Sequence, residues 1–325
     1  MMNKLFKITA KALKNKPITP NEAKYLISPK TDFHELLHGA NKIREHFKGR
    51  KVGLCSIINA KSGNCTEDCK FCAQSSHHSA EIKKYPLVDS KNIIAGYKQS
   101  KNISAQGFSI VTSGNRLSEK DFSSLCRVSK KITVSLKGPY VCASLGRLSE
   151  EQIKRLKESG IKRLHHNLET SRKHFRKICS THTYDERIQN IKNIKKTGLK
   201  ICSGGIFGMG ETWDDRIDMA FTLRNLKVDS VPLNFLIPVK GTCLENIAPL
   251  TPQEILKIIA LYRYILPDYN IRVCAGREKN LGDMQSWIFY AGANGMMIGG
   301  YLTQAGRKVE DDLRMVKELG LVPLR

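Results

Sequence analysis

The sequence lacks any hydrophobic run of membrane-spanning length and is poor in acidic residues. No stretch of about eighteen or more apolar residues occurs, so we expect no transmembrane helix. Only 30 of the 325 residues are acidic, against 54 lysines and arginines, and the formal net charge is +24. No Gly/Ser-rich or Pro-rich linker and no internal repeat divides the chain. These absences favour one large unit over a membrane protein or a string of small domains.

The sequence also lacks a recognisable secretory signal, although it contains 10 cysteines. We therefore expect a reducing compartment, the cytoplasm, and metal chemistry instead of a disulfide framework. Residues 1–16 are rich in lysine and free of arginine, which predicts a basic helix and not a transit peptide. Because the lysines are spread along the whole chain, they predict solvated helix faces and no nucleic-acid partner.

The most informative motif is a short polar loop that carries Cys65, Cys69 and Cys72 with the spacing C-x3-C-x2-C. Three thiolates so close together suit three irons of one 4Fe–4S cluster. No fourth cysteine follows at ligand spacing, so one iron keeps an open coordination site, as in catalytic metal centres. A structural zinc site, with a nitrogen from His77 or His78, would need a different spacing. The motif is typical of the radical S-adenosylmethionine (SAM) superfamily, in which the open iron binds SAM.

Eight short apolar runs alternate with amphipathic stretches after residue 50, which predicts buried parallel strands separated by helices. The runs are 52–58, 108–112, 140–145, 164–169, 199–206, 230–236, 270–275 and 295–299. Helix starts are indicated at Ser149, with Gln152 in a capping box, and at Thr251-Pro252. The pattern predicts an α/β fold, a (β/α)8 TIM-type barrel over residues 51–325 with an N-terminal helical extension over residues 1–50. Active sites of such barrels lie at the carboxyl ends of the strands, where the cysteine loop begins.

Polar residues mark the ends of several later runs. Side chains alternate along a strand, so His165, Asn167 and Glu169 are predicted to share the face that points to the barrel mouth, with His166 on the other face. The glycines that include Gly204 would let the backbone approach a ligand closely.

Cysteines on three later runs suggest a second metal centre. Cys142, Cys202 and Cys274, with Arg272 on the same face as Cys274, could meet inside the barrel and hold a second iron–sulfur centre. A free cysteine is otherwise a small buried hydrophobe. We expect that role for the remaining cysteines, Cys55, Cys126, Cys179 and Cys243.

From about residue 50 onward, these features together resemble the biotin synthase family. The matching stretches are residues 64–74, 166–171, 202–206, 208–212, 231–234, 240–242 and 275–278. The resemblance implies a homodimeric sulfurtransferase that inserts sulfur into dethiobiotin to form biotin, the last step of biotin biosynthesis. It implies that the reduced 4Fe–4S cluster, supplied with electrons by a flavodoxin or ferredoxin, cleaves SAM to a 5′-deoxyadenosyl radical. This radical removes hydrogen from dethiobiotin, and a second cluster donates the sulfur.

The resemblance also implies roles for single residues. Cofactor contacts are assigned to Phe71 near the adenine, Glu169 at the ribose hydroxyls, and Asn167, Gly204 and Ile206. Substrate contacts are assigned to Asn167, to Asn234 at the ureido ring, and to His165 and Thr303. The usual family has a different residue at His165 and a second threonine at Gln304.

The usual second cluster of the family is 2Fe–2S, held by three cysteines and one arginine. Cys142, Cys202 and Arg272 match three of these positions, but Ser109 takes the place of the remaining cysteine. A serine oxygen is a harder and weaker iron ligand than a thiolate. The hypothesis is therefore that Cys274 replaces the missing thiolate, with Ser109 as the other candidate ligand, in a 2Fe–2S cluster or a variant of it.

Three alternatives accompany this interpretation. The first is another radical enzyme with a similar barrel, such as a hydrogenase-maturation or methylornithine-forming enzyme, which would not need Cys142, Cys202 and Arg272. The second is a tRNA-modifying sulfur inserter, for which no RNA-binding segment is visible. The third is a non-catalytic iron–sulfur or zinc protein, which gives no reason for polar residues at the strand ends.

Overall fold

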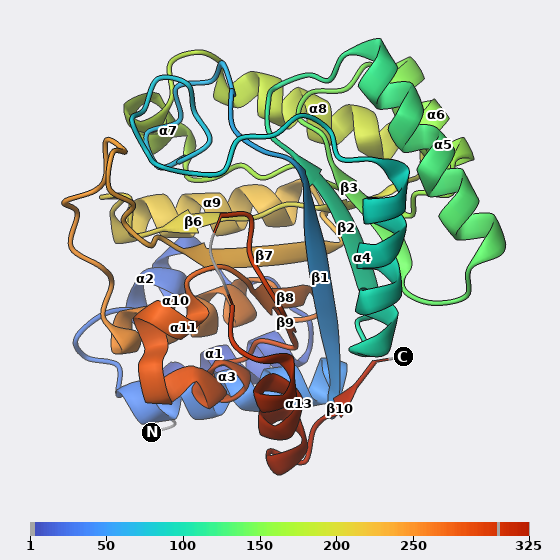
Figure 1. The fold of residues 1–325 in the computed structure, drawn as a ribbon. Coiled ribbons are helices and arrows are strands. Elements are labelled where there is room, and N and C mark those ends of the chain that lie inside the picture. The colour runs from blue at the N-terminus through green and yellow to red at the C-terminus, as the bar shows by residue number, and fades with distance from the viewer. Residues whose placement is uncertain (1–3, 304–305, 325) are drawn as a thin grey trace.

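A ring of parallel strands forms the centre of the computed structural model, which describes residues 4–303 and 306–324 (Figure 1). Neighbours follow the order β1-β2-β3-β4-β5-β7-β8-β9, and a β9–β1 pairing closes the ring. The predicted barrel is therefore confirmed. The strands are β1 (Lys51–Lys61), β2 (Gly107–Thr112), β3 (Tyr140–Ser144), β4 (Arg163–His165), β5 (Lys200–Cys202), β6 (Gly205–Phe207), β7 (Ser230–Phe235), β8 (Asn270–Val273), β9 (Gly295–Met297) and β10 (Val322–Pro323). The short β10 pairs in parallel with the first two residues of β1.

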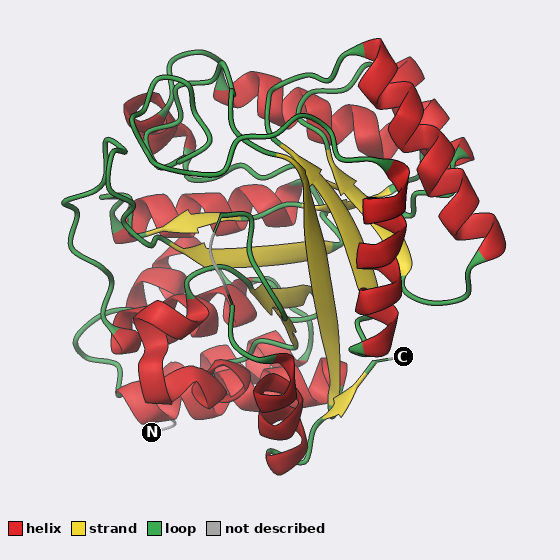
Figure 2. Cartoon of the chain, viewed as in Figure 1, coloured by secondary structure: helices red, strands yellow, loops and turns green. Residues whose placement is uncertain are grey.

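Helices surround the ring, as the helix and strand colouring makes plain (Figure 2). They are α1 (Lys4–Leu13), α2 (Pro20–Leu26), α3 (Phe33–Lys48), α4 (Ser90–Asn102), α5 (Glu119–Ser135), α6 (Glu150–Glu158), α7 (Arg172–Ile178), α8 (Tyr184–Lys196), α9 (Trp213–Asn225), α10 (Pro252–Ile265), α11 (Arg277–Leu281), α12 (Trp287–Tyr290) and α13 (Val309–Glu318), with a 3-10 segment, η1 (Gly282–Ser286). Ser149 caps α6 in the predicted box with Gln152, and Thr251 caps α10 directly before Pro252. None of the helices in the described part of the chain is long and apolar enough to cross a membrane.

The first three helices form the extension that was predicted for residues 1–50. They lie at the end of the barrel opposite the loop that follows β1 (Figure 1). Tyr264 on α10 ties them to the barrel, because its hydroxyl lies 2.9 Å from Thr9 Oγ1 and 3.5 Å from the Leu36 carbonyl. Gly39 leaves room for this ring, since a Cβ there would lie 1.9 Å from the hydroxyl. A domain boundary at residue 50 stays a prediction.

The predicted strand 199–206 consists of two pieces, β5 and β6, separated at Ser203 and Gly204. The glycines at this break allow the chain to lie close to neighbouring backbone. A Cβ on Gly204 would lie 1.9 Å from the Pro232 carbonyl oxygen, and one on Gly205 would lie 2.4 Å from that of Glu169. The preceding β4 also ends early, at His165, and Glu169 follows with a φ of 69° as an isolated bridge partner of Gly205.

Candidate active site

The three-cysteine loop is fixed by its own backbone and by the end of α7. Within the loop, the Cys65 amide donates to the Gln74 carbonyl at 3.0 Å, and the Cys72 amide donates to the Cys69 carbonyl at 2.9 Å. Outward, the Lys70 amide donates to the Ile178 carbonyl at 2.9 Å, so the loop lies beside α7 (Figure 1). The three thiols are therefore held at the mouth of the barrel, as the sequence predicted.

The spacing of these thiols suits a cluster better than a single ion. Thiolates that share one Zn²⁺ at the usual bond length lie roughly 3.8 Å apart. In the described residues, the single group of three ligating side chains within 4.8 Å of one another is Cys69, Cys179 and His182. Cys65, Cys69 and Cys72 thus spread further apart, around a cavity of about 210 Å³ that they line together. The donor set fits a 4Fe–4S cluster.

Cys179 is a contact of the loop that the sequence did not reveal. Its sulfur lies 3.8 Å from that of Cys69, 3.2 Å from Asp68 Oδ1 and 3.2 Å from His182 Nδ1. Hydrogen bonding within the thiol pair lowers the pKa of Cys179 and raises that of Cys69. Cys179 is not among the residues that line the cavity, so it supports Cys69 from behind instead of completing the cluster's ligands. Cys179 is buried, as expected, but its contacts with Asp68 and His182 are polar, which the sequence did not predict.

The predicted cofactor residues come together at the junction of two cavities. His165, Asn167 and Glu169 line both the 210 Å³ cavity and a deeper one of about 420 Å³. His166 lines the first cavity as well, contrary to the predicted alternation, because β4 ends at His165 and the chain leaves the sheet. Phe71 also lines both cavities.

The side chains at this junction hold one another in place. Asn167 Oδ1 accepts from the Gly204 amide at 3.2 Å, and its Nδ2 donates to Glu169 at 3.4 Å. Arg187 lies 3.6 Å from Glu169 Oε1 and donates to the Asn167 carbonyl at 2.8 Å. Burial raises the pKa of Glu169, although Arg187 opposes this effect.

The two predicted backbone contacts differ in position. Ile206 on β6 lines the deeper cavity. Gly204 is not among the residues described as lining either cavity, because its amide faces Asn167 and its Cα packs against Pro232. The contact of Gly204 with the cofactor stays a prediction. In the structure, Gly204 positions the side chain of Asn167 through its amide.

The deeper cavity gathers the predicted second-cluster residues. Ser109, Cys142, Cys202, Arg272 and Cys274 all line it. They come from β2, β3, β5, β8 and the residue directly after β8. The structure therefore brings all five predicted positions to one place.

Cys55 on β1 lines the same cavity, which the sequence did not predict. The guanidinium of Arg272 donates directly to its sulfur, and the other end of that group lies 3.3 Å from Gln106 Oε1 and 3.4 Å from the Tyr140 hydroxyl. The role of a small buried hydrophobe was thus wrong for Cys55. The signal that could have identified it is its place inside the first strand, ten residues before Cys65.

Buried polar atoms without partners point to a polar occupant of this cavity. Ser109 Oγ and His165 Nε2 belong to residues that line the cavity, and both atoms are buried and have no hydrogen bond within the protein. A buried polar group left unpaired costs about 1–3 kcal/mol. Burial, with the charges of Arg163 and Arg272, lowers the pKa of His165 to about 3, so its ring is neutral. These orphaned atoms and the thiols fit an iron–sulfur cluster with its sulfides.

The substrate positions lie nearer the mouth. Asn234 lines the deeper cavity and bridges strands, donating to the Gly205 carbonyl and accepting from the Ala275 amide, both at 3.1 Å. Thr303 also lines this cavity, whereas Gln304 lies outside the described residues.

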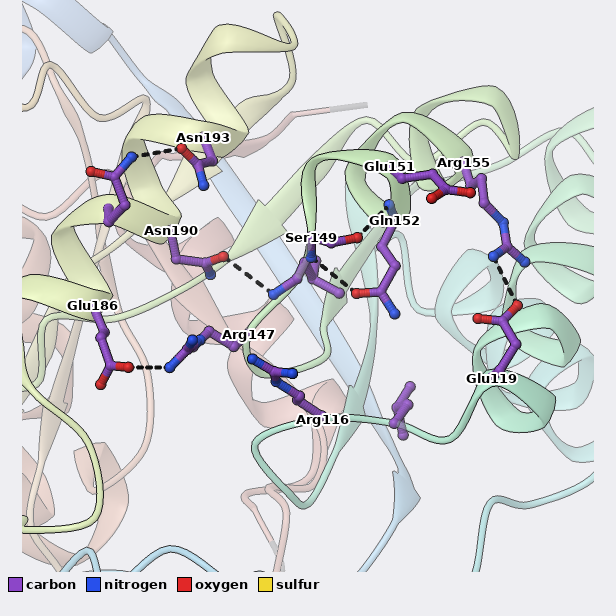
Figure 3. Close-up of a pocket in the computed structure, with 13 residues that line it drawn as sticks. Arg116, Glu119, Arg147, Ser149, Glu151, Gln152, Arg155, Glu186, Asn190 and Asn193 are labelled. Atoms are coloured by element: carbon purple, nitrogen blue, oxygen red, sulfur yellow. Dashed lines mark hydrogen bonds and ion pairs between the residues drawn. The ribbon is translucent and has the colours of Figure 1, made fainter.

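A further hollow of about 580 Å³ lies outside the barrel, between the start of α6 and α8 (Figure 3). Its charged side chains largely neutralise one another, since Arg147 pairs with Glu186, and Arg155 with Glu119 at 2.8 Å. It contains no cysteine, so the chemistry belongs to the two cavities inside the barrel mouth.

A parallel barrel with a three-thiol loop at its mouth defines a radical SAM enzyme, and residues 60–223 match the Radical SAM superfamily. Residues 232–322 match the Biotin and Thiamin Synthesis associated domain. The chain is 50% identical to the biotin synthase of Endomicrobium trichonymphae, over 89% of this chain and 90% of that protein. It is 47% identical to that of Carboxydothermus hydrogenoformans, over 99% of both. The chain belongs to the biotin synthase family.

Solved structures with the same fold are more distant in sequence. A methylornithine synthase superposes with a TM-score of 0.85 at 21% identity, covering 98% of this chain and 97% of that one. An FeFe-hydrogenase maturase from Carboxydothermus hydrogenoformans gives 0.84 at 18% identity, covering 98% and 79%. These likenesses show the fold alone. Family membership gives this sulfurtransferase a 4Fe–4S cluster, SAM and a second iron–sulfur cluster as cofactors.

Proposed function

We propose that this chain converts dethiobiotin to biotin by radical-mediated insertion of sulfur. The observation that carries the proposal is that two separate sets of thiols open onto adjoining cavities with a shared wall of His165, Asn167 and Glu169. Cys65, Cys69 and Cys72 would hold the 4Fe–4S cluster. A substrate between the two sets would contact both the radical source and the sulfur source.

The bound groups supply the chemistry that side chains cannot: the first cluster and SAM generate the radical, and the second cluster supplies sulfur. The protein's residues bind and orient. Glu169 would accept hydrogen bonds from SAM, Asn167 would hydrogen-bond it, and Phe71 would pack against its adenine. The wall residues exclude water, which keeps the radical from reacting with solvent.

On the substrate side, Asn234 offers its amide to the ureido ring while its two existing backbone bonds hold it in one orientation. Thr303 contacts the substrate at the outer end of the cavity. Cys142, Cys202 and Arg272 would hold the second cluster, and Cys274 would replace the thiolate that is missing at Ser109.

The test is anaerobic reconstitution followed by incubation with SAM, a reductant and dethiobiotin. We expect biotin, deoxyadenosine, and more iron and sulfide per chain than one 4Fe–4S cluster supplies. The Cys274→Ser variant should lose the additional iron and keep the first cluster. If protein with a single cluster forms deoxyadenosine but no biotin, the proposed function is wrong and the chain catalyses another radical SAM reaction.

We also propose that an acidic flavodoxin or ferredoxin delivers the electron at a basic face beside the cysteine loop. This face comprises Lys70, Lys173, Arg176 and Lys177, which are all exposed. In the described residues no carboxylate pairs with any of them. Unpaired positive charge next to a buried cluster loop suits a negatively charged electron carrier.

Charge reversal tests this face. The double variant Lys70→Glu, Lys177→Glu should raise the KM for reduced flavodoxin about ten-fold, because each reversal replaces a weak attraction with a repulsion. Reduction by dithionite should not change. The matched control is Lys130→Glu, Lys131→Glu, two exposed lysines on α5, far from the loop. Equal effects of the two double variants would refute the docking face.

The same proposal includes a homodimer in the cytoplasm, as the family resemblance implies. Light scattering of the purified protein tests the dimer, since a monomer of 36.6 kDa would contradict it. Fractionation of cells that express the chain tests the compartment.

A further inference from the structure

We propose that Cys69 and Cys179 form a modification site, which a peroxide converts to a reversible disulfide when Cys69 holds no iron. The inference goes beyond the proposed function, which uses Cys69 as a cluster ligand and gives Cys179 no part. Its consequence for the cluster rests on that role of Cys69, whereas the disulfide itself does not. Once formed, the disulfide would deprive the three-cysteine loop of one ligand until a thiol reductant restores it.

The backbone around the two cysteines is fastened so that their side chains face each other. The amide of the residue after Cys69 donates to the carbonyl of the residue before Cys179 at 2.9 Å. Asp68, the residue before Cys69, accepts from the amide of Ser180, the residue after Cys179, also at 2.9 Å. Cys69 and Cys179 therefore occupy facing positions on two segments that run in opposite directions, with their sulfurs 3.8 Å apart. A disulfide needs this arrangement, because it joins facing side chains on backbones that are already close.

Further hydrogen bonds hold the two segments together beside the thiols. The Thr181 hydroxyl donates to Glu67 Oε2 at 2.6 Å and accepts from the Asp68 amide at 3.2 Å. The Thr181 amide also donates to Asp68 Oδ1 at 3.2 Å. None of these bonds uses a cysteine sulfur, so they do not depend on whether Cys69 binds iron. Rotation of the two side chains is then enough to bring the sulfurs to bonding distance, about 2 Å.

The polar surroundings of Cys179 make it the sulfur that reacts first. His182 Nδ1 lies 3.2 Å from it. The guanidinium of Arg187 donates to His182 Nε2 at 3.0 Å, so the proton of the ring lies on Nδ1, where it faces the sulfur. An imidazole N–H beside a sulfur is typical of reactive thiols, whereas thiols in apolar surroundings are inert. Cys69 and Cys179 are only 8% and 6% exposed, which favours an oxidant as small as hydrogen peroxide.

The oxidation balances as two steps. Hydrogen peroxide transfers one oxygen to the Cys179 sulfur, which becomes a sulfenic acid, while the O–O bond breaks and one water leaves. The Cys69 thiol then attacks that sulfur. The S–S bond forms, the S–O bond breaks and the second water leaves. In total, two thiols lose two electrons and two protons, and one peroxide is reduced to two waters. A Cys69 sulfur that is bound to iron cannot make this attack, so the cluster blocks the reaction.

The competing disulfides lie within the loop itself, between Cys69 and either Cys65 or Cys72. These three thiols line the 210 Å³ cavity and do not all lie within 4.8 Å of one another. An unfolded chain favours the loop pairings, because closing a short loop costs the least entropy. The folded protein favours Cys179, because the hydrogen bonds around it have already brought the two segments together. Folded and unfolded protein should therefore form different disulfides.

Peptide mapping of the full chain tests this difference. Iron is removed anaerobically with a chelator, the protein is treated with one equivalent of hydrogen peroxide, either folded or in urea, and the remaining thiols are alkylated. Iron-loaded protein is treated in the same way. Trypsin, which cleaves after lysine and arginine, then places the cysteines on three peptides: 62–70 with Cys65 and Cys69, 71–83 with Cys72, and 178–187 with Cys179.

We expect peptide 62–70 to be joined to peptide 178–187 in the folded, iron-free protein, with fragmentation placing the bond at Cys69. In urea, pairings within the loop should dominate instead. Iron-loaded protein should contain several-fold less of the Cys69–Cys179 bond, and dithiothreitol should reverse it. A disulfide within the loop as the main product of the folded protein, or equal amounts of the Cys69–Cys179 bond in folded and urea-treated protein, would overturn the inference.

The variant Cys179→Ser gives an independent readout, and circular dichroism confirms that it is folded. Without its partner, Cys69 should be oxidised to the sulfinic acid, which dithiothreitol does not reduce. The fraction of Cys69 thiol recovered after peroxide and then dithiothreitol should fall several-fold relative to wild type. The matched control Cys126→Ser, on α5, should recover like wild type.

Equal recovery of Cys69 in wild type and Cys179→Ser would contradict the inference. The mapping uses neither SAM nor dethiobiotin, so a failure to form biotin would refute only the proposed function. Conversely, absence of the Cys69–Cys179 bond would leave the proposed function standing.

Discussion

Replacing Arg187 with methionine tests how the cofactor wall is held together. The guanidinium lies 3.6 Å from Glu169 Oε1, 2.8 Å from the Asn167 carbonyl and 3.0 Å from His182 Nε2. The side chains of Arg187 and Glu169 are each 12% exposed, so little solvent screens the pair. Methionine preserves most of the packing on Phe175 and removes the charge.

The magnitude follows from the distance. Two unit charges 3.6 Å apart attract by roughly 4–5 kcal/mol at an effective dielectric constant of about 20. Burial already raises the pKa of Glu169, and loss of the Arg187 charge should raise that pKa further, which favours the neutral carboxyl in the variant. A neutral carboxyl forms hydrogen bonds weaker by about 1–2 kcal/mol than a carboxylate does. The SAM dissociation constant should therefore rise about 5- to 30-fold.

Anaerobic equilibrium dialysis with labelled SAM on the iron-loaded protein measures this effect. The loss should shrink as the pH rises and Glu169 ionises, while wild-type affinity stays level. The matched control is Arg172→Met, which removes an arginine paired with Asp185 at 2.7 Å on the outside of the barrel and should leave the affinity unchanged. Unchanged binding in Arg187→Met, or a loss that alkaline pH does not relieve, would refute the reasoning.

Three other perturbations probe the loop, the strand break and a helix cap. Cys179→Ala removes a sulfur 3.8 Å from Cys69 whose lowered pKa favours the negatively charged form, so the midpoint potential of the first cluster should rise by about 40 mV, equivalent to about 1 kcal/mol, in an EPR redox titration. Gly204→Ala forces a Cβ to within 1.9 Å of the Pro232 oxygen. It should lower the free energy of unfolding by roughly 3 kcal/mol and the melting temperature by several degrees. Hydrogen bonds hold the pKa of Asp215 below its usual value against the effect of burial. Its contribution to stability is thus present above about pH 4 and lost as the pH falls through the lowered pKa, so Asp215→Asn should flatten the acid limb of thermal stability.

Each of these three variants has a matched control at a residue of the same type. Cys126→Ala, on α5, should leave the potential unchanged, and Gly96→Ala, in the helix α4, should stay within about 1 kcal/mol of wild type. Asp214→Asn, next to Asp215 but exposed, should retain the acid limb. A potential shift in neither cysteine variant, equal melting of both glycine variants, or parallel acid limbs would contradict the respective interpretation.

Much of the fold could be predicted because its signals are local. The apolar runs, the Ser149 and Thr251 caps and the cysteine spacing each depend on residues within one element. The break between β5 and β6 was not predicted, since it follows from Gly204 touching Pro232, a contact between strands.

The same division applies to the site. Alternation correctly placed His165, Asn167 and Glu169 toward one side but failed for His166, because β4 ends where the chain leaves the sheet. Cys55 and Cys179 were missed for another reason. Their roles depend on what the folded chain brings opposite them, Arg272 from β8 and Cys69 from the loop, and neither partner is near in sequence.

The placement of the deeper thiols on separate strands has a consequence for the order in which the enzyme matures. Cys65, Cys69 and Cys72 lie in one short loop, so these three thiols are close together before the barrel has folded. Cys55 lies on β1 and Cys274 directly after β8, far apart in the sequence, and they face the same cavity only when β9 closes against β1. Closing so long a loop is the late and costly event of folding. A metal centre held by the deeper thiols, as proposed above, could therefore be loaded only into a finished barrel, whereas one held by the three-cysteine loop could be filled while the barrel is still forming.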